Sequence, residues 1–424
     1  MVILLGFGPG DGGSTPLGTI QLTFFMRFFM EKLLLIGINT RSMLNSALKL
    51  DYELYSTSYF STSDTPQIEN QKIILEEHND ESSGIFEDHF SSSNILEISR
   101  DYIDETDYII PISGISPSEF SKKDQKKILG TKDVSKIENK FQFYKEIKDE
   151  FKTPETFFIN DVDEAIEISK NNPKSKYILK PLKGSGGYNI KLLNNEAEFQ
   201  LNDSEKYILQ EYVDGINLSS SVLGSKDTKK TIMNSRLLTE NDFEKNNSYI
   251  YIGNILPLTN ESILTKVKDI DKINREMIET SQNIAHKFDL IGSVGVDYIL
   301  NENGLYVIEV NPRIQGTFEC VEKSLQINML DAHIKSCLNI DIPIPKAKYY
   351  SYKKIIYSPC RNKYSKIDLD NIYDLPHIGT ITEKSEPLLT IIDKDTDFKK
   401  LCEKIDYSSQ VVSEKTRRYP REML

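Results

Sequence analysis

The sequence predicts a multidomain protein of mixed α/β and α+β class, on three observations. The chain has 424 residues, more than a single hydrophobic core usually serves. After Lys32 a strand, a turn, a helix and a second strand follow one another, as in an open α/β domain. Paired apolar runs within 293–310 predict an antiparallel hairpin, and Pro343-Ile344-Pro345 precedes a short β-rich terminal segment.

The first 29 residues stand apart from the rest of the chain. They are apolar, rich in glycine and nearly uncharged before Arg27, so they lack the positive start of a signal peptide. Glycine and proline interrupt their two apolar pieces, which are too short to span a bilayer. Met30 opens a typical first strand of an α/β protein. We therefore expect residues 1–29 to be a non-native or disordered extension.

Residues 30–130 are predicted to form the open α/β domain. A continuous apolar run is typical of a buried parallel strand, and capping residues before an apolar periodic stretch indicate a helix. These patterns predict strands at Leu33–Ile38, Leu54–Tyr59 and Tyr108–Ile112 and a helix at Met43–Leu50. The stretch Ser61–Ser99 is polar with a weak pattern, and no element is predicted in it.

Residues 131–340 alternate helical and strand patterns, and 341–424 are β-rich. The predicted helices are Lys132–Glu150, Asp161–Asn171, Lys266–Phe288, Met329–Leu338 and Phe398–Lys404. The predicted strands are Thr156–Ile159, Tyr177–Pro181, Ile190–Leu193, Tyr207–Tyr212, Leu218–Leu223, Ser293–Leu300, Leu305–Val310, Lys353–Ser358, His377–Thr382 and Leu388–Ile392.

Composition and charge argue against several classes of protein. Hydrophobic residues make up 38% and charged residues 27% of the chain, as in an ordinary soluble protein. The net charge of −12 and the pI near 5.2 argue against sequence-independent binding of nucleic acid, which needs a basic surface. The four cysteines form no CxxC pair, so neither a zinc site nor a disulfide framework is predicted. We expect a cytoplasmic protein with no nucleic-acid or membrane partner.

The hairpin within 293–310 carries the strongest chemical signal. Asp297 lies on its first strand, and Glu309 and Asn311 on the second point to one face because the strand period is two. A tight turn can place Asp297 beside Glu309 there. Two carboxylates and an amide oxygen make a site for Mg²⁺, and Arg313 returns to the same face, where it could hold a phosphate or carboxylate. The alternative is an exposed hairpin with ordinary charges.

Two further segments suit a nucleotide. Lys180 precedes the loop Gly184-Ser185-Gly186-Gly187, whose main-chain N–H groups could approach phosphate oxygens. By itself such a turn is more often a flexible hairpin. The strand end at Glu211-Tyr212-Val213 offers main-chain groups to a purine edge, although any strand could end in this way.

In this order and at these distances, the motifs resemble the ATP-grasp superfamily over residues 130–340. The preceding domain then resembles the Rossmann-like preATP-grasp domain. The segment Asp374–Thr380, with Glu386-Pro387 after it, is similar to the small closing β domain of the biotin carboxylase and carbamoyl-phosphate synthetase branch. From Met30 the chain resembles uncharacterised archaeal-type carboligase-like ATP-grasp proteins, with the pyrrolysine-biosynthesis ligase as a more distant relation.

The resemblance implies a two-lobed ATP-grasp fold at 131–340 with a lid lobe at about 150–212, and a closing domain at 341–424. It also implies a role for each motif residue. By this resemblance, Lys140 and Lys180 contact the ATP phosphates, and the loop Gly184, Ser185, Gly186 and Gly187 closes over those phosphates. The adenine is held by Glu211, Tyr212 and Val213. The cation, Mg²⁺ or alternatively Mn²⁺, is bound by Asp297, Glu309 and Asn311, and the catalytic residues are Arg313 and Lys180. Asn217 departs from the pattern, because many members have an acidic ribose ligand there.

The implied function is an ATP- and Mg²⁺-dependent carboxylate–amine ligase that forms a C–N bond on small molecules through an acyl-phosphate. Two rivals stay open: carboxylase, carbamoyl-phosphate-like or kinase-like chemistry on the same fold, and a non-catalytic nucleotide-binding protein. The substrates are expected between the first domain and the ATP-grasp unit, near Asn39–Arg41 and Ser113–Gly114. A homodimer is left open as the assembly.

Overall fold

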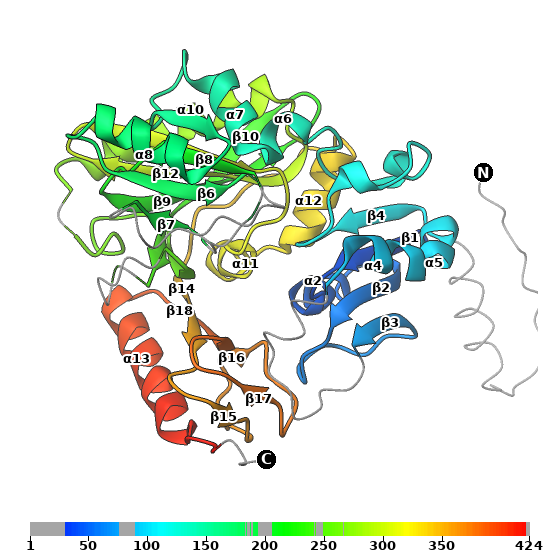
Figure 1. The fold of residues 1–424 in the computed structure, drawn as a ribbon. Helices are drawn as coiled ribbons and strands as arrows, with labels where there is room; N and C mark the ends of the chain where they lie inside the picture. The colour runs from blue at the N-terminus through cyan, green and yellow to red at the C-terminus, as the bar shows by residue number, and fades with distance from the viewer. Residues whose placement is uncertain are drawn as a thin grey trace, which may run out of the picture.

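The computed structural model describes residues 30–75, 90–182, 184, 187, 190–193, 206–240, 242, 249–265 and 267–420, so the predicted extension at 1–29 lies outside them. Within these ranges the strands form one parallel sheet, a small and a large antiparallel sheet, and a two-stranded pair (Figure 1). Helices separate the sheets, and the predicted α/β and α+β multidomain class is confirmed. No described helix combines the length and apolar character needed to cross a bilayer.

The parallel sheet lies within residues 30–130, the predicted first domain, and both of its faces are covered. Its strands, in the order β3-β2-β1-β4, are β1 (Lys32–Gly37), β2 (Glu53–Phe60), β3 (Asn70–Leu75) and β4 (Tyr108–Pro111). The helices are α2 (Arg41–Ala47), α4 (Ser92–Ile98) and α5 (Arg100–Glu105), followed by the 3₁₀ turns Pro117–Glu119 and Asp124–Lys127. Leu34 and Ile36 share a core with residues of α4 and α5, whereas Leu33 and Leu35 share one with helices far along the chain. This alternation along β1 explains its continuous apolar run.

The small sheet follows two short helices. Its strands, in the order β5-β8-β6-β7, are β5 (Thr156–Ile159), β8 (Tyr207–Glu211), β6 (Tyr177–Pro181) and β7 (Lys191–Leu192), all antiparallel. The helices are α6 (Ser135–Glu138), α7 (Lys140–Ile147) and α8 (Val162–Asn171). Ala165 of α8 packs in a core with Tyr177, Leu179 and Leu209.

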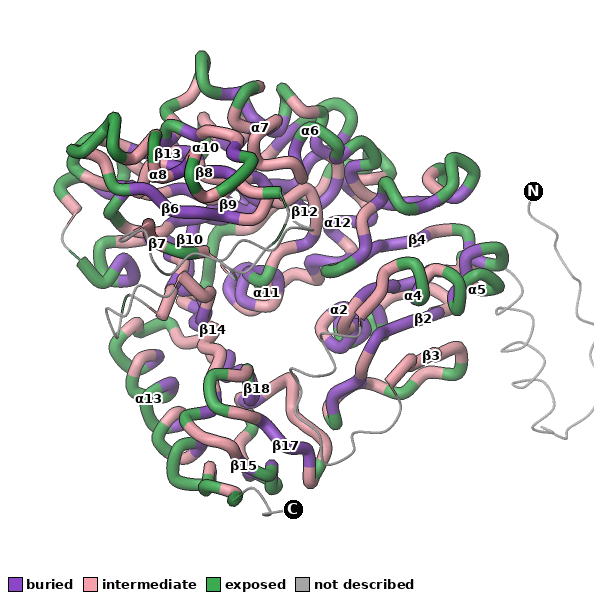
Figure 2. The backbone as a smooth tube through the Cα atoms, in the orientation of Figure 1, coloured by how far each residue is buried: buried purple, intermediate pink, exposed green. Residues whose placement is uncertain are grey.

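The large sheet is antiparallel and contains the hairpin predicted from the sequence. In the order β13-β12-β9-β10-β11-β14-β18-β16, its strands are β13 (Gly304–Asn311), β12 (Gly292–Asn301), β9 (Ile216–Gly224), β10 (Lys229–Thr239), β11 (Tyr251–Leu256), β14 (Tyr350–Tyr357), β18 (Pro387–Asp395) and β16 (Ile372–Tyr373). Figure 2 shows β9 and β12 as largely buried.

Helices cover the two faces of the large sheet. On one face α10 (Ile270–Lys287) packs Met277 and Ile284 in a core with Leu218 and Val222 of β9. On the other, α11 (Phe318–Leu325) and α12 (Met329–Cys337) share a core with Leu223. That core also contains Leu33 and Leu35, so the same helices join the first domain to the large sheet.

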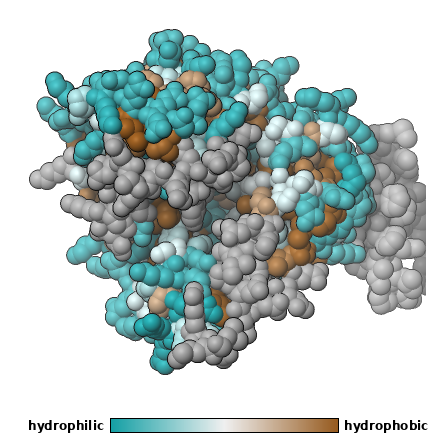
Figure 3. Space-filling model, viewed as in Figure 1, coloured by the Kyte–Doolittle hydropathy of each residue, from teal (hydrophilic) through white to brown (hydrophobic). Residues whose placement is uncertain are grey.

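The terminal segment continues the large sheet. β14 pairs with β11 over four residue pairs, from Gly253↔Lys354 to Leu256↔Ser351. The helix α13 (Phe398–Lys415) packs on β14 and β18, and β15 (Asn362–Lys363) pairs with β17 (Ile381–Thr382). On the face seen in Figure 3, hydrophilic residues cover most of the described surface, and hydrophobic residues gather in smaller patches.

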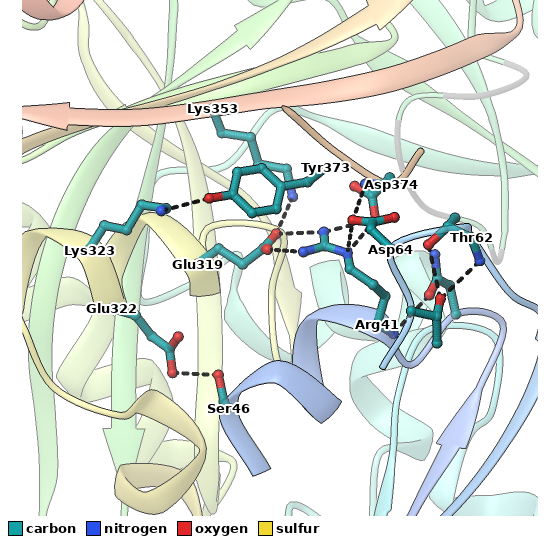
Figure 4. Close-up of polar contacts among 12 residues, drawn as sticks. Arg41, Ser46, Thr62, Asp64, Glu319, Glu322, Lys323, Lys353, Tyr373 and Asp374 are labelled. Carbon is teal, nitrogen blue, oxygen red and sulfur yellow. Dashed lines mark hydrogen bonds and ion pairs between the residues drawn. The ribbon is translucent and has the colours of Figure 1, made fainter. Parts of the chain in front are cut away.

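One buried arginine forms ion pairs that link the first domain, the helix after the hairpin and the terminal segment. Arg41 of α2 is 2% exposed and forms ion pairs with Glu319 of α11 at 2.6 Å and with Asp374 at 2.8 Å. Lys353 of β14 contacts the other oxygen of Glu319 at 3.2 Å. Figure 4 shows the Arg41 guanidinium pointing between Glu319 and Asp374, with Asp64 beside them. The cluster therefore joins the first domain, the helix after the hairpin and the terminal segment.

Several predicted elements differ from the structure. The single helix predicted at Lys132–Glu150 is two helices, because Asn139 has an extended backbone and caps α7. The polar stretch Ser61–Ser99 contains β3 and α4. Only Ile381–Thr382 of the strand predicted at His377–Thr382 is a strand. Strands β10 and β11 were not predicted.

Candidate functional site

The hairpin brings its three predicted cation ligands together. Asp297 of β12 pairs with Glu309 of β13, and Gly295 pairs with Asn311. The Asn311 amide donates from Nδ2 to Oδ2 of Asp297 at 2.9 Å, which leaves the amide oxygen of Asn311 for another partner. The register thus places two carboxylates and one amide on one face, as the period-two argument predicted.

The electrostatics of this cluster suit a cation. Burial, followed by the charge of Glu309, raises the pKa of Asp297, while hydrogen bonds from Ser219 and Asn311 and the charge of Arg313 oppose the rise. Two neighbouring carboxylates of this kind are stabilised as anions by a divalent ion. Across the described ranges no three His, Cys, Asp or Glu side chains converge as metal ligands, so an ion here would need Asn311 and oxygens from outside the protein.

Two lysines face the cluster. Lys140, the first residue of α7, has its Nζ 3.7 Å from Oε2 of Glu309. Lys180 of β6 is 7% exposed and donates to Oε1 of Gln210 at 2.8 Å. Burial lowers the pKa of Lys180 to about 8, with the charge of Lys140 adding to the fall and that of Glu309 opposing it.

Lys140, Lys180, Gln210 and Glu309 line one cavity. The rest of its wall is mainly apolar and comes from α7 and strands β8 and β13: Phe143, Tyr144, Ile147, Ile208, Val307 and Ile308. Cationic and apolar side chains that line the same cavity suit a ligand with an anionic part and a flat apolar part. The structure therefore groups the predicted phosphate ligands with one of the predicted cation ligands.

The glycine loop approaches the same lysine. The carbonyl oxygen of Gly184 accepts a hydrogen bond of 2.7 Å from Nζ of Lys140. Gly187 has a φ of +80°, and a Cβ there would lie 2.0 Å from the carbonyl oxygen of Tyr249, so this position requires glycine. Ser185 and Gly186 lie outside the described residues.

The segment Glu211–Val213 borders a groove beside the hairpin turn. The groove is lined by Glu211, Tyr212, Val213, Asp214, Asn301, Glu302, Asn303 and Tyr306. The N–H groups of Glu211 and Tyr212 donate to the carbonyl oxygens of Glu155 and Lys176, both at 2.8 Å. The N–H groups of Glu211 and Tyr212 therefore already have partners. The predicted main-chain contacts to a base would be made by the carbonyl groups of this segment and by the main chain of Val213.

Arg313 lies between the hairpin and the first domain. In the described part of the chain its only hydrogen bond is a long one, 3.5 Å from Nη1 to the carbonyl oxygen of Ile314. It lines a small cavity with Pro111 and Ile115, which flank the predicted substrate edge at Ser113–Gly114. A partly buried guanidinium with so few partners can accept an anion.

Sequence reasoning missed two polar residues of this site. Ser219 of β9 donates to Oδ1 of Asp297 at 2.6 Å, and Gln315 donates to Ser219 at 3.3 Å. The signal for Ser219 was present, because three consecutive serines interrupt the apolar strand predicted at Leu218–Leu223. Gln315 lies in a loop, and no periodic pattern pointed to it.

Comparisons with known proteins find relatives of the part of the chain that carries this site. Residues 137–317 match the family model of the ATP-grasp domain. An uncharacterised protein of Methanocaldococcus jannaschii is 28% identical over 370 residues, which are 86% of this chain and 88% of that protein. The tyramine–L-glutamate ligase of the same organism is 32% identical over 179 residues, 42% of this chain and 44% of that enzyme.

Solved structures extend the likeness over nearly the whole chain. The structure of N5-carboxyaminoimidazole ribonucleotide synthetase from Thermotoga maritima matches with a TM-score of 0.65 at 15% identity, covering 90% of this chain and 98% of that one. At this identity the likeness concerns the fold alone. Taken with the family-model match, it confirms the resemblance found in the sequence: residues 137–317 of this chain form an ATP-grasp domain.

Proposed function

We propose that this protein is an ATP- and Mg²⁺-dependent carboxylate–amine ligase that acts on small molecules through an acyl-phosphate intermediate. The observation that carries the proposal is the convergence of Asp297, Glu309 and Asn311 on one sheet face, with Lys140 in contact with Glu309. Carboxylates next to lysines and an arginine are what a magnesium–triphosphate needs, because each charge then faces its opposite.

The donor set fits Mg²⁺. Asp297 and Glu309 supply carboxylate oxygens, and the hydrogen bond from Nδ2 of Asn311 to Asp297 turns the amide oxygen of Asn311 away from that carboxylate. These three residues would hold the ion, which would reduce the negative charge that builds up on the transferred phosphoryl group. Lys140 and Lys180 would bind phosphate oxygens, and the apolar wall of their cavity would contact the base.

The reaction has two steps. A substrate carboxylate oxygen attacks the γ-phosphorus of ATP, the bond between that phosphorus and the β–γ bridging oxygen breaks, and ADP leaves. The amine nitrogen then attacks the acyl carbon, the bond to the phosphate oxygen breaks, and the amide, phosphate and a proton are released. Arg313, which has one long hydrogen bond among the described residues, would bind the acyl-phosphate and the tetrahedral species after it.

The relatives support this class of reaction. The name of tyramine–L-glutamate ligase states that an amine is joined to an amino acid, and its similarity to this chain is limited to 179 residues. We propose the same class of substrates here, a small carboxylate and a small amine, without transferring tyramine or glutamate. The cytoplasmic location and a homodimeric assembly stay predictions.

The first test removes the proposed cation ligands. Glu309→Ala and Asn311→Ala should each lower Mg²⁺-dependent release of ADP by at least about a hundredfold, because positioned electrostatic groups in a dry site contribute several kcal/mol. Release of ADP is measured with panels of carboxylates and amines, chosen first by thermal shift in the presence of MgATP.

The matched control is Glu279→Ala, on the exposed face of α10, which should keep wild-type turnover. Turnover that survives in both hairpin variants would contradict the site assignment. Release of ADP that depends on bicarbonate but not on any amine would favour the carboxylase alternative. Tight binding of MgATP without turnover on any tested pair would favour a non-catalytic nucleotide-binding protein.

A further inference from the structure

Asp297 is held from the side opposite Glu309 by a residue of the next strand. Ser219 of β9 pairs with Asp297 in the sheet register and is fully buried. Its hydroxyl donates to Oδ1 of Asp297 at 2.6 Å, while the Asn311 amide donates to Oδ2 at 2.9 Å. Each carboxylate oxygen thus has one protein donor and still offers a lone pair to a cation.

The direction of the Ser219 hydroxyl is set by a third residue. Gln315 donates from Nε2 to Oγ of Ser219 at 3.3 Å, and Oγ of Ser221 donates to Oε1 of Gln315 at 3.3 Å. A serine hydroxyl has a single hydrogen. Because the Gln315 amide occupies a lone pair of the Ser219 oxygen, that hydrogen is directed to Asp297.

The position of the Gln315 amide depends on a glycine. A Cβ built on Gly295 would lie 1.4 Å from Nε2 of Gln315, so the amide occupies the space that any other residue at 295 would fill. Gly295 is paired with Asn311 across the hairpin. A glycine at this point of β12 therefore lets a loop residue reach across the sheet to Ser219.

We infer that Ser219 and Gln315 are positioning residues of the cation site: the chain Ser221–Gln315–Ser219 orients Asp297, and through Asp297 it orients Asn311. The inference rests on the proposed function and adds residues that contact neither the cation nor the nucleotide. Hydrogen-bonded neighbours of metal ligands commonly contribute about 10- to 100-fold in metal affinity.

The test compares two neighbouring serines. Ser219→Ala should weaken binding of MgADP by about tenfold, measured by calorimetry, while binding of ADP in excess EDTA stays unchanged. Ser220→Ala is the matched control, because Ser220 is also fully buried on β9 but lies on the opposite face of the sheet. The Ser220 hydroxyl donates to the amide oxygen of Asn234 at 2.7 Å. The control variant should bind MgADP as the wild type does. Ser219→Thr, which keeps the hydroxyl, should restore the affinity.

Two more variants keep the test decisive if Ser219→Ala folds poorly. Gln315→Met removes the amide without changing the strand, and Gly295→Ala displaces the same amide, so both should weaken MgADP more than metal-free ADP. The inference is overturned if Ser219→Ala and Gln315→Met bind MgADP like the wild type, or if Ser220→Ala weakens it equally.

The same measurements distinguish a failure of this inference from a failure of the proposed function. If Glu309→Ala abolishes the advantage of MgADP over ADP and Ser219→Ala keeps it, only the positioning role is wrong. If Glu309→Ala itself keeps that advantage, the cation site is wrong, and the proposed function fails with it.

Discussion

Lys180 is almost fully buried beside the proposed phosphate site, and its charge therefore depends on what occupies that site. Burial lowers its pKa from an ordinary 10.5 to about 8. A phosphate nearby would favour the charged form and raise this pKa again. The lysine would then carry its proton most firmly when a nucleotide is bound.

This gives a pH-dependent prediction. At about pH 9 the free protein should have Lys180 mostly neutral, so binding of MgADP should take up a proton. Calorimetry in two buffers of different ionisation enthalpy measures this uptake. Lys180→Met should abolish it, and Lys174→Met, at an exposed position before β6, should leave it unchanged. Equal uptake in all three proteins would contradict the assignment.

The same pKa predicts the direction in which the free energy of unfolding changes with pH. Between about pH 8 and 10.5 the unfolded protein holds a proton on Lys180 that the folded protein has lost, so unfolding becomes less favourable as pH rises through this window. Below pH 8 the burial of the charge costs about 3 kcal/mol. Lys180→Met should accordingly be more stable than the wild type at neutral pH, with a difference that shrinks towards pH 10.

At the scale of elements, the break between α6 and α7 positions Lys140. The side chain of Asn139 accepts a hydrogen bond from the N–H of Gln142 at 2.9 Å and so caps α7, whose first residue is Lys140. The cap fixes the first turn of α7 and with it the backbone position of Lys140, from which the side chain extends to Glu309. The break that the sequence pattern concealed is thus part of the site.

Asn139→Ala should lower the free energy of unfolding by about 1 kcal/mol and also weaken MgADP binding several-fold, because the first turn of α7 loses its anchor. The matched control is Asp161→Ala, which removes the same kind of cap from α8, where Asp161 accepts from Glu164 N–H at 2.8 Å. This variant should lose similar stability with unchanged affinity. Equal losses of affinity in both would contradict a specific role for Asn139.

The elements also show how far the sequence could predict the structure. The hairpin was predictable because period-two patterning and a tight turn act over a short distance, and they brought Asp297 and Glu309 together. Ser219 and Gln315 were not, because their roles depend on which strand lies beside β12 and on the space above Gly295. Strand order and loop packing are set by contacts between distant residues, which a single sequence does not display.

At the scale of the whole molecule, Arg41 is the joint between three parts of the chain. Arg41→Met should destabilise the protein by about 3–5 kcal/mol near neutral pH, because the carboxylates of Glu319 and Asp374 lose their buried counter-charge. Chemical denaturation measures the loss. Lys335→Met, which removes a half-exposed lysine paired with the half-exposed Asp331 on α12, should cost at most about 1 kcal/mol.

Acid should narrow the difference between wild type and Arg41→Met. Burial would raise the pKa of Glu319, but the charges of Lys353 and Arg41 lower it below the ordinary 4.5. The stability from Glu319 is therefore present above about pH 4.5 and is lost as pH falls below it. The variant has less of this contribution to lose, because Glu319 keeps its ion pair with Lys353 but loses the one with Arg41. A difference that is constant from pH 7 to 4 would contradict this account.

The large sheet has a consequence of a different kind. β14 of the terminal segment bonds the free side of β11, and β18 and β16 continue outward from it. Without them, β11 would present a row of unpaired N–H and C=O groups, which is the usual template for aggregation between identical chains. The terminal segment thus covers a sheet edge that would otherwise be open, and this protection against self-association is independent of any part it plays in catalysis.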